Sequence, residues 1–299
     1  MKRRLQSDGG SGSRLPGWVP LLFLPAIPVV FRHSLPAWLF MWTLAFAIFA
    51  GLKWQTWWQA REAMPHAAWR SFAYLAAWPG MDAETFMDGE QRPPRPQLDE
   101  WIWAVSKTIL GVALIWGVAR SMPASWPLAR GWIGLLGLVL LLHFGSFHLI
   151  ALFWQAQGVD AQPIMAKPIL SRTLSEFWGK RWNLGFRQLA YDLVFRPLHK
   201  RMGVAGASLL VFLLSGLIHD LVISLPARGG YGLPTAYFVV QGLGVTLERS
   251  AAGRRMGLQR GLSAWVFMLI IAAGPAFWLF HPAFVMRVIL PFMQAVRAL

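Results

Sequence analysis

Two polar residues, Asn183 and His219, have types and positions suited to chemistry inside a membrane. His219 ends the run 204–219, VAGASLLVFLLSGLIH, in which nearly all other residues are apolar. An ionisable side chain within a membrane span costs at least ~2.5 kcal/mol, so it usually marks a site. Asn183 closes the run 171–183, SRTLSEFWGKRWN, which is dense in polar and aromatic residues. A candidate base in the bilayer, preceded by such a segment, predicts a membrane enzyme.

The neighbours of His219 favour a functional role over a structural one. The structural alternative is a histidine that only hydrogen-bonds between helices. Ser215 and Gly216 lie one helical turn earlier, where they would let a backbone or a ligand approach closely. Asp220 follows directly, but on a helix it points about 100° away from His219. It is therefore not an obvious partner for the imidazole.

The segment before Asn183 has the composition of a site for an anionic, aromatic-stacking ligand. Trp178 and Trp182 are four residues apart, and the cations around them are Arg172, Lys180, Arg181 and Arg187. Rings for an adenine and cations for phosphates suit a nucleotide such as coenzyme A. The alternative is an interfacial helix with a tryptophan belt and snorkelling cations. Asn183 offers both a donor and an acceptor, which can hold a carbonyl or orient a base.

No metal site is predicted. His143 and His148 are five residues apart, which places them about 140° apart on a helix, a poor arrangement for two ligands of one ion. The chain has no Cys, which also excludes disulfides and thiolate catalysis. His148 is nevertheless an intramembrane histidine and a candidate for the wall of the cavity around His219.

Composition predicts an all-α, polytopic membrane protein. The 299 residues are 56% hydrophobic and 14% charged, with 18 Trp and a mean hydropathy of +0.45. This excludes an ordinary soluble globule. We expect about eight transmembrane helices with interfacial or re-entrant helices around 74–82 and within 155–203. The expected spans are 15–31, 35–52, 101–119, 131–154, 204–225, 231–248, 262–280 and 283–296. Residues 1–14 are expected to be a disordered tail, and 15–299 a single membrane-embedded domain.

The net charge of +15 is explained by membrane topology. With the N-terminus inside, 22 of the 28 Lys and Arg fall on cytoplasmic segments. Four fall outside: Arg32, Arg120, Arg130 and Arg228. This positive-inside bias predicts a cytoplasmic N-terminus in a multi-pass protein, of the cytoplasmic membrane if the source is bacterial. Because the cations are dispersed over loops between spans, nucleic-acid binding is not expected.

Four motifs together resemble the membrane-bound O-acyltransferases, specifically the wax synthase-like (long-chain-alcohol O-fatty-acyltransferase-like) branch. They are 78–82 (WPGMD), 176–183 (EFWGKRWN), 195–198 (FRPL) and 215–219 (SGLIH). The resemblance covers roughly residues 70–225. In that family a histidine is the proposed base and an asparagine is a second polar site. By motif, those roles fall on His219 and Asn183, whereas Asp220 stands where the family more often has Glu.

The resemblance implies transfer of an acyl group from acyl-CoA to the hydroxyl of an alcohol. His219 and Asn183 would be catalytic, and the substrate-binding candidates are Arg172, Trp178, Lys180, Arg181, Trp182 and Arg187. The expected partners are acyl-CoA, an alcohol acceptor and the lipid bilayer, with acyl-CoA as co-substrate and no cofactor. Two alternatives stay open: acetyl transfer to a sugar or specialised metabolite, and a proton-coupled transporter. No internal repeat supports the transporter.

Overall fold

The computed structural model describes residues 15–62, 67–90 and 92–299, and this part of the chain contains helices and no strand. The first half contains α1 Leu15–Phe23, α2 Ala26–Val30, α3 Ala37–Ala60, α4 Ala68–Ala77, α5 Ala83–Met87, α6 Leu98–Val112, α7 Ala119–Ser121, α8 Pro127–Val139 and α9 Phe147–Ala156. The second half contains α10 Leu174–Glu176, α11 Leu184–Ala190, α12 Arg196–His219, α13 Leu225–Ala227, α14 Leu233–Arg249, α15 Ala251–Arg255, α16 Gly261–Ala273, α17 Ala276–Leu279, α18 Pro282–Phe284 and α19 Leu290–Ala295.

Several helices are joined end to end by π-helical turns, so they continue with little interruption. These turns are η1 Ala113–Val118, η2 Leu140–Ser146, η4 Phe177–Arg181, η5 Tyr191–Phe195, η6 Asp220–Ser224 and η7 Val285–Ile289, and η3 Pro168–Leu170 is a 3₁₀ helix. Two of them, η4 and η6, adjoin the segments that carry Asn183 and His219. π-Helical turns are frequent at functional sites.

Five helices of the described chain are long and apolar enough to cross a membrane. They are Ala37–Ala60, Leu98–Ser121, Pro127–Ala156, Leu184–Ala227 and Gly261–Leu279. The expected all-α, multi-pass membrane protein is therefore supported, but eight spans are not confirmed. The other apolar runs form the shorter helices Pro16–Val30 and Pro282–Ala295 and the 17-residue α14.

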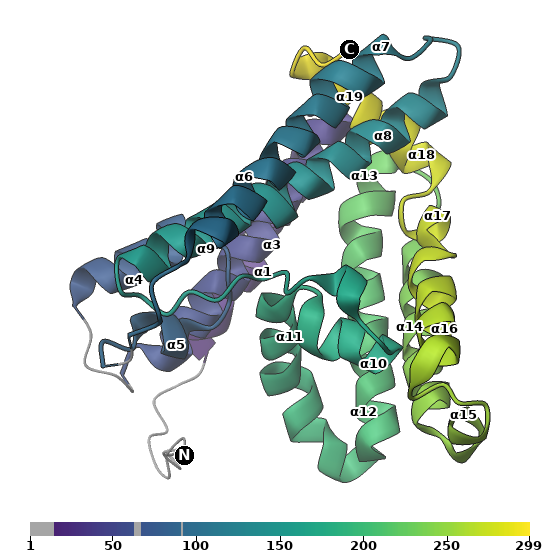
Figure 1. Cartoon of the computed structure of the whole chain (residues 1–299). Helices are drawn as coiled ribbons and strands as arrows, with labels where there is room; N and C mark the ends of the chain where they lie inside the picture. Colours follow the sequence, from purple (N-terminus) through teal and green to yellow (C-terminus); the bar gives the residue numbers. More distant parts are fainter. Residues whose placement is uncertain (1–14, 63–66, 91) are drawn as a thin grey trace.

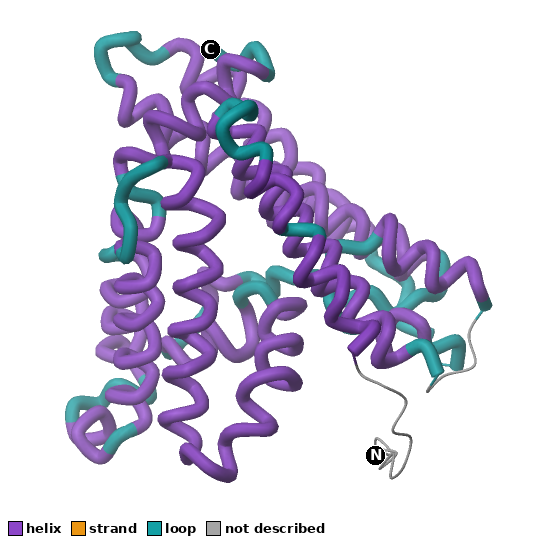
Figure 2. Tube along the Cα trace, turned by 180° about the vertical axis from the view of Figure 1, so that it is seen from behind, coloured by secondary structure: helices purple, strands orange, loops and turns teal. Residues whose placement is uncertain are grey.

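The long helices form two arms that meet at one end, giving the molecule the outline of a V (Figure 1). One arm contains α3, α6, α8 and α9, and the other contains α12, α14 and α16. The same V is seen from behind in Figure 2. A buried apolar cluster that includes Ile115, Leu135, Phe284 and Met293 joins the arms where they meet. The segment with α10 and α11 lies between the arms.

A single glycine turns the long helix Leu184–Ala227 into a hairpin. This helix would be roughly 66 Å long if straight, about twice the hydrocarbon thickness of a bilayer. At Gly203, φ is 70° and ψ is 172°, a conformation that glycine adopts without steric cost. The parts before and after Gly203 lie side by side (Figure 1). At ~1.5 Å per residue, Asn183 and His219 are about 30 and 24 Å from the turn, so they come to similar heights.

Close approach of two backbones places α14 beside the end of α12. A Cβ atom on Gly216 would lie only 2.7 Å from Cα of Thr235. Only glycine allows this contact, which confirms the expectation that Gly216 admits a neighbouring backbone. The contact lies one turn before His219, so α14 forms one wall of the surroundings of that histidine.

We expect the connection after α9 to face the cytoplasm. Because the chain has no native Cys, a cysteine introduced at the exposed Gln157 can be probed alone. It should resist an impermeant thiol reagent added outside intact cells and react after lysis. The control is a cysteine at Ser125, which is exposed in the connection between α7 and α8, at the other end of these spans. It should react in intact cells. The reverse pattern would invert the orientation. Ser13, the equivalent N-terminal position, lies outside the described residues.

Candidate active site

The hydrogen bonding of His219 identifies which ring nitrogen can accept a proton. His219 is the last residue of α12 and is partly buried. Its Nδ1 lies 2.7 Å from the carbonyl oxygen of Ser215. A carbonyl oxygen only accepts, so Nδ1 carries the hydrogen and Nε2 of the neutral ring has the free lone pair. Nε2 is therefore the ring nitrogen that could accept a proton from a ligand.

An aromatic path connects His219 to the predicted ligand-binding segment. The ring of Phe238, on α14, lies 4.4 Å from the His219 ring and 5.7 Å from the Trp178 ring, centroid to centroid. The indole Nε1 of Trp178 donates to Oε1 of Gln241 at 3.1 Å. Gln241 is fully buried, and its Nε2 donates to the carbonyl of Ile271 at 2.6 Å. Gln241, which is 63 positions from Trp178 in the sequence, thus holds this tryptophan near His219.

Phe238 and Gln241 were not among the residues singled out in the sequence. They lie three positions apart in the predicted span 231–248, which places them on one face of a helix. The signal for Gln241 was present, because a polar side chain inside an apolar run commonly has a specific partner. Phe238 gave no signal, because a phenylalanine in a span is ordinary.

Both tryptophans of the segment contact protein rings. Trp182 stacks on Phe177 at 5.3 Å with an interplanar angle of 18°, and it meets Phe144 edge-on at 6.1 Å. Trp178 meets Phe212 edge-on at 5.6 Å. The predicted role of these rings in stacking on a nucleotide stays a prediction. In this conformation one face of Trp182 is covered by Phe177.

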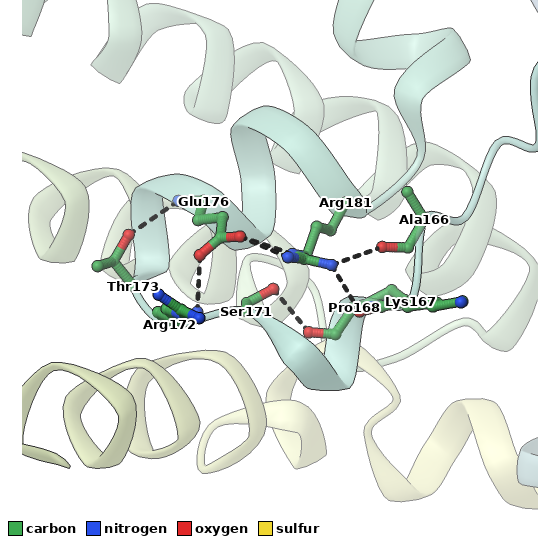
Figure 3. A network of polar contacts seen from close by, with 8 residues as sticks. All are labelled: Ala166, Lys167, Pro168, Ser171, Arg172, Thr173, Glu176 and Arg181. Atoms are coloured by element: carbon green, nitrogen blue, oxygen red, sulfur yellow. Dashed lines mark hydrogen bonds and ion pairs between the residues drawn. The ribbon is translucent and has the colours of Figure 1, made fainter. Parts of the chain in front are cut away.

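Arg181 organises the loop that leads into the segment (Figure 3). Its guanidinium forms an ion pair with Glu176 at 2.7 Å and donates to the carbonyl oxygens of Ala166 and Lys167 at 3.3 and 3.5 Å. Glu176 also accepts from the backbone N–H of Arg172 at 2.8 Å. The bond from Arg172, together with Arg181, lowers the pKa of Glu176. Arg181 is thus committed to shaping this loop.

The other three predicted phosphate-binding cations are exposed. Arg172, Lys180 and Arg187 form no ion pair with any residue that the structure describes. Their role in binding an anion stays a prediction. Of the four cations, these three are available to a ligand from solution.

A buried carboxylate on α14 fixes the start of α10. Glu248 is 3% exposed, and its Oε2 accepts from the backbone N–H of Leu174 at 2.7 Å, while its Oε1 accepts from Ser175 at 3.2 Å. The first N–H groups of a helix lack intrahelical partners, so this carboxylate acts as a cap from a distant part of the chain. Glu248 was not predicted as a site residue.

Asn183 has a structural role that does not use its whole side chain. It precedes α11 with φ 44° and ψ 61°, the left-handed region that Asn tolerates better than most residues. Its Oδ1 accepts from the N–H of Phe186 at 3.4 Å. Its amide Nδ2 donates to no described residue, so this donor remains for a ligand. Asn183 and His219 share the hairpin but do not hydrogen-bond to each other.

Asp220 holds the neighbouring helix. Its carboxylate accepts from Ser224 Oγ at 2.8 Å, from the N–H of Gly232 at 2.9 Å and from Thr235, through both its hydroxyl and its N–H. It therefore caps the start of α14, the helix that carries Phe238. The prediction that it is not the obvious orienting partner of His219 agrees with these contacts.

Lys53 is a buried cation that the topology count assigned to the cytoplasmic side. It lies within Ala37–Ala60 and is 1% exposed, so it is packed inside the protein rather than solvated in a loop. Its ammonium lies 3.2 Å from the centroid of the Tyr74 ring and donates to the carbonyl of Gly80, in the WPGMD motif. The neighbouring residue Met81 packs against Gly185. A Cβ atom added to Gly185 would lie 3.2 Å from the backbone nitrogen of Met81. Lys53 thus anchors a motif that supports α11.

His148 is bonded away from His219. Its Nδ1 lies 3.0 Å from Nζ of Lys107, on α6. The structure gives no contact between His148 and the residues around His219. Within the described ranges, no group of three or more His, Cys, Asp or Glu is arranged to hold a metal ion.

The described helices thus bring together a partly buried histidine, an amide group with an available donor, and the aromatic residue Trp178 of the segment 171–183, which precedes Asn183 and also carries the cations. Residues 161–240, which include Asn183, His219 and Phe238, match the family described as "Membrane bound O-acyl transferase family". The resemblance predicted from the four motifs is therefore confirmed for this part of the chain.

Curated relatives point to the same branch. The chain is 30% identical to the long-chain-alcohol O-fatty-acyltransferase of Simmondsia chinensis over 142 residues, 43% of this chain and 40% of that protein. It is 30% identical over 141 residues to the probable long-chain-alcohol O-fatty-acyltransferase 7 of Arabidopsis thaliana, 42% of this chain and 40% of that protein. With acyl-CoA–sterol O-acyltransferase 1 of the same plant, identity is 27% over 137 residues, 42% of this chain and 39% of that protein. The chain thus spans about two fifths of the length of these relatives.

Proposed function

We propose that this chain transfers an acyl group from acyl-CoA to the hydroxyl of an alcohol, as a wax ester synthase-like O-acyltransferase. The observation that carries the proposal is the path from Trp178 through Phe238 to His219, whose Nε2 has a free lone pair. It joins a candidate donor-binding segment to a candidate base at membrane depth. The names of the curated relatives support the same class of reaction.

In the proposed reaction, Nε2 of His219 accepts the alcohol proton as the alcohol oxygen attacks the thioester carbon. The free amide donor of Asn183 stabilises the negative charge that develops on the carbonyl oxygen. The C–S bond then breaks, the ester forms, and the proton on His219 passes to the departing CoA thiolate. Apolar surroundings exclude the water that would otherwise hydrolyse the thioester.

The direct test uses the purified protein with acyl-CoAs from acetyl to stearoyl and a panel of short-chain, long-chain and sugar alcohols. We expect free thiol and an ester product only when both substrates are present, with a preference for long acyl chains. Preference for acetyl-CoA and a sugar would favour the short-chain alternative. Proton-dependent flux into proteoliposomes without thiol release would overturn the proposal in favour of transport.

For the donor end, we expect Lys180→Glu to raise the KM for acyl-CoA about ten- to a hundredfold. The loss of one charge-assisted contact typically costs about 1.5–3 kcal/mol. The KM for alcohol should change much less. Lys180 is the informative position because Arg181, the other cation of the motif, is held by Glu176. Arg201→Glu, an exposed cation near the Gly203 turn, is the matched control. An unchanged KM for acyl-CoA would mean that Lys180 only anchors the segment at the interface.

A further inference from the structure

A cavity of about 200 Å³ lies at the end of the spans opposite to the segment 157–183. It is formed where the connection before α3 meets the loop after α13. Its polar wall includes Arg32, Arg228 and Tyr231, and its apolar wall includes Leu35, Phe40 and Leu225. In Figure 1, α13 lies below α8, close to where the two arms meet. None of the residues assigned above to acyl transfer lines this cavity.

The cavity concentrates positive charge without an acid to balance it. Arg32 and Arg228 are two of the four cations that the sequence places on this side of the membrane. No Asp or Glu lines the cavity, and neither arginine forms an ion pair with a described residue. One N–H group of Arg32 donates to the carbonyl oxygen of Val29 at 3.3 Å. Because a guanidinium has five N–H donors, both arginines retain donors for an anion.

The loop that presents Arg228 is held rigidly. Arg228 has φ 50°, in the left-handed region that is costly for a residue with a side chain. Arg287 donates to the carbonyl oxygens of Ala227 and Arg228 at 3.1 and 3.0 Å. Farther along the loop, Gly232 donates to Asp220. A strained residue kept in place by such contacts is typical of a preorganised binding site.

The position of the cavity matches the depth of lipid phosphates. The helix Ala37–Ala60 begins beside it, and the helix Leu184–Ala227 ends beside it. The ends of spans lie at the membrane–water interface, where tyrosines are enriched and phosphate groups are found. The apolar wall would accommodate the glycerol and first acyl carbons, while the arginines would face the phosphate.

We propose that this cavity binds the phosphate headgroup of an anionic membrane lipid. Arg32 and Arg228 hold the phosphate oxygens, and the apolar wall with Leu35, Phe40 and Leu225 contacts the chain-bearing part. The site is separate from the proposed acyl transfer, and its occupancy is measured without turnover.

The test is equilibrium binding of phosphatidylglycerol to the detergent-purified protein, measured by native mass spectrometry. We expect tighter binding of phosphatidylglycerol than of phosphatidylcholine. Replacing both residues (Arg32→Gln with Arg228→Gln) should weaken phosphatidylglycerol binding by at least tenfold, because each charge-assisted contact is worth about that factor. The matched control is Arg120→Gln, which removes an exposed cation from the same side but outside the cavity.

Three further measurements separate the outcomes. Thermal unfolding verifies that the double variant is folded, and glutamine at position 228 keeps the backbone strain unchanged because it also has a Cβ. If folding fails, Arg32→Gln alone should still weaken binding severalfold. Inorganic phosphate should bind much more weakly than phosphatidylglycerol, and equal affinity would overturn the lipid assignment. Binding within twofold of the unchanged protein in the folded double variant, or an equal loss in Arg120→Gln, would overturn the site.

Discussion

Replacing His219 with alanine should leave the protein folded in the membrane and lower kcat by about 10²–10⁴, the usual contribution of a general base. Within the described chain the imidazole makes one hydrogen bond, to Ser215 in its own helix, so its removal disturbs little beyond the contact with Phe238. Thiol release from acyl-CoA, measured at saturating alcohol, gives kcat directly.

His148→Ala is the matched control for this experiment. His148 is also a partly buried histidine in a span, but it is bonded to Lys107 rather than placed on the aromatic path. We expect its removal to lower kcat far less than the removal of His219. If His219→Ala retained most of its thiol-releasing turnover, the proposed mechanism would be wrong.

Asn183→Asp should lower kcat by roughly 10²–10³, the typical effect of losing one donor that stabilises an oxyanion. The substitution separates chemistry from structure. Aspartate retains an oxygen that can accept from the N–H of Phe186 and tolerates the left-handed backbone at φ 44°. It replaces the amide donor, which no described residue uses, with a second carboxylate oxygen, whose negative charge would oppose an oxyanion rather than stabilise it. The melting temperature should therefore change little while turnover falls.

Asn183→Gly completes the comparison. Glycine tolerates the left-handed backbone but removes both the cap and the donor, so kcat should fall as in Asn183→Asp, with a small loss of stability. Combining Asn183→Asp with His219→Ala should lower kcat little beyond His219→Ala alone, because groups that act as a unit are not additive. Full activity of Asn183→Asp would leave Asn183 with only its capping role.

The sequence by itself determined the class of molecule and the two residues on which the chemistry is proposed to depend. Long apolar runs can satisfy their backbone groups in lipid only as helices, so the all-α fold follows from composition. His219 could be recognised because an ionisable residue in such a run is costly. The FWGKRWN and SGLIH motifs supplied the family resemblance, which the match over residues 161–240 confirms. Gly216 before His219 predicted the close approach of another backbone.

Only the tertiary structure decided what surrounds these residues. Phe238 and Gln241 reach the segment with Trp178 across 60 or more positions, and Glu248 caps Leu174 across 74. Local periodicity carries no information about such pairings, because they depend on how α14 packs against α10 and η4. The number of spans differed for a related reason. The apolar content of a segment predicts that it can be buried. Whether the segment can cross the membrane depends on the length of its helix and on breaks such as the one at Gly203.

Packing also decided which cations are buried or paired and which stay exposed. By sequence, Arg181 and Lys180 were equivalent neighbours, and Lys53 was only one of the 22 cations counted on cytoplasmic segments. In the fold, Arg181 is occupied by Glu176 and two carbonyls, Lys180 stays exposed, and Lys53 is buried over Tyr74. A charged side chain that leaves water needs partners, and those partners come from segments that only folding brings together. Residue type and spacing therefore predicted the candidate chemistry, whereas three-dimensional packing decided which charges remain available for it.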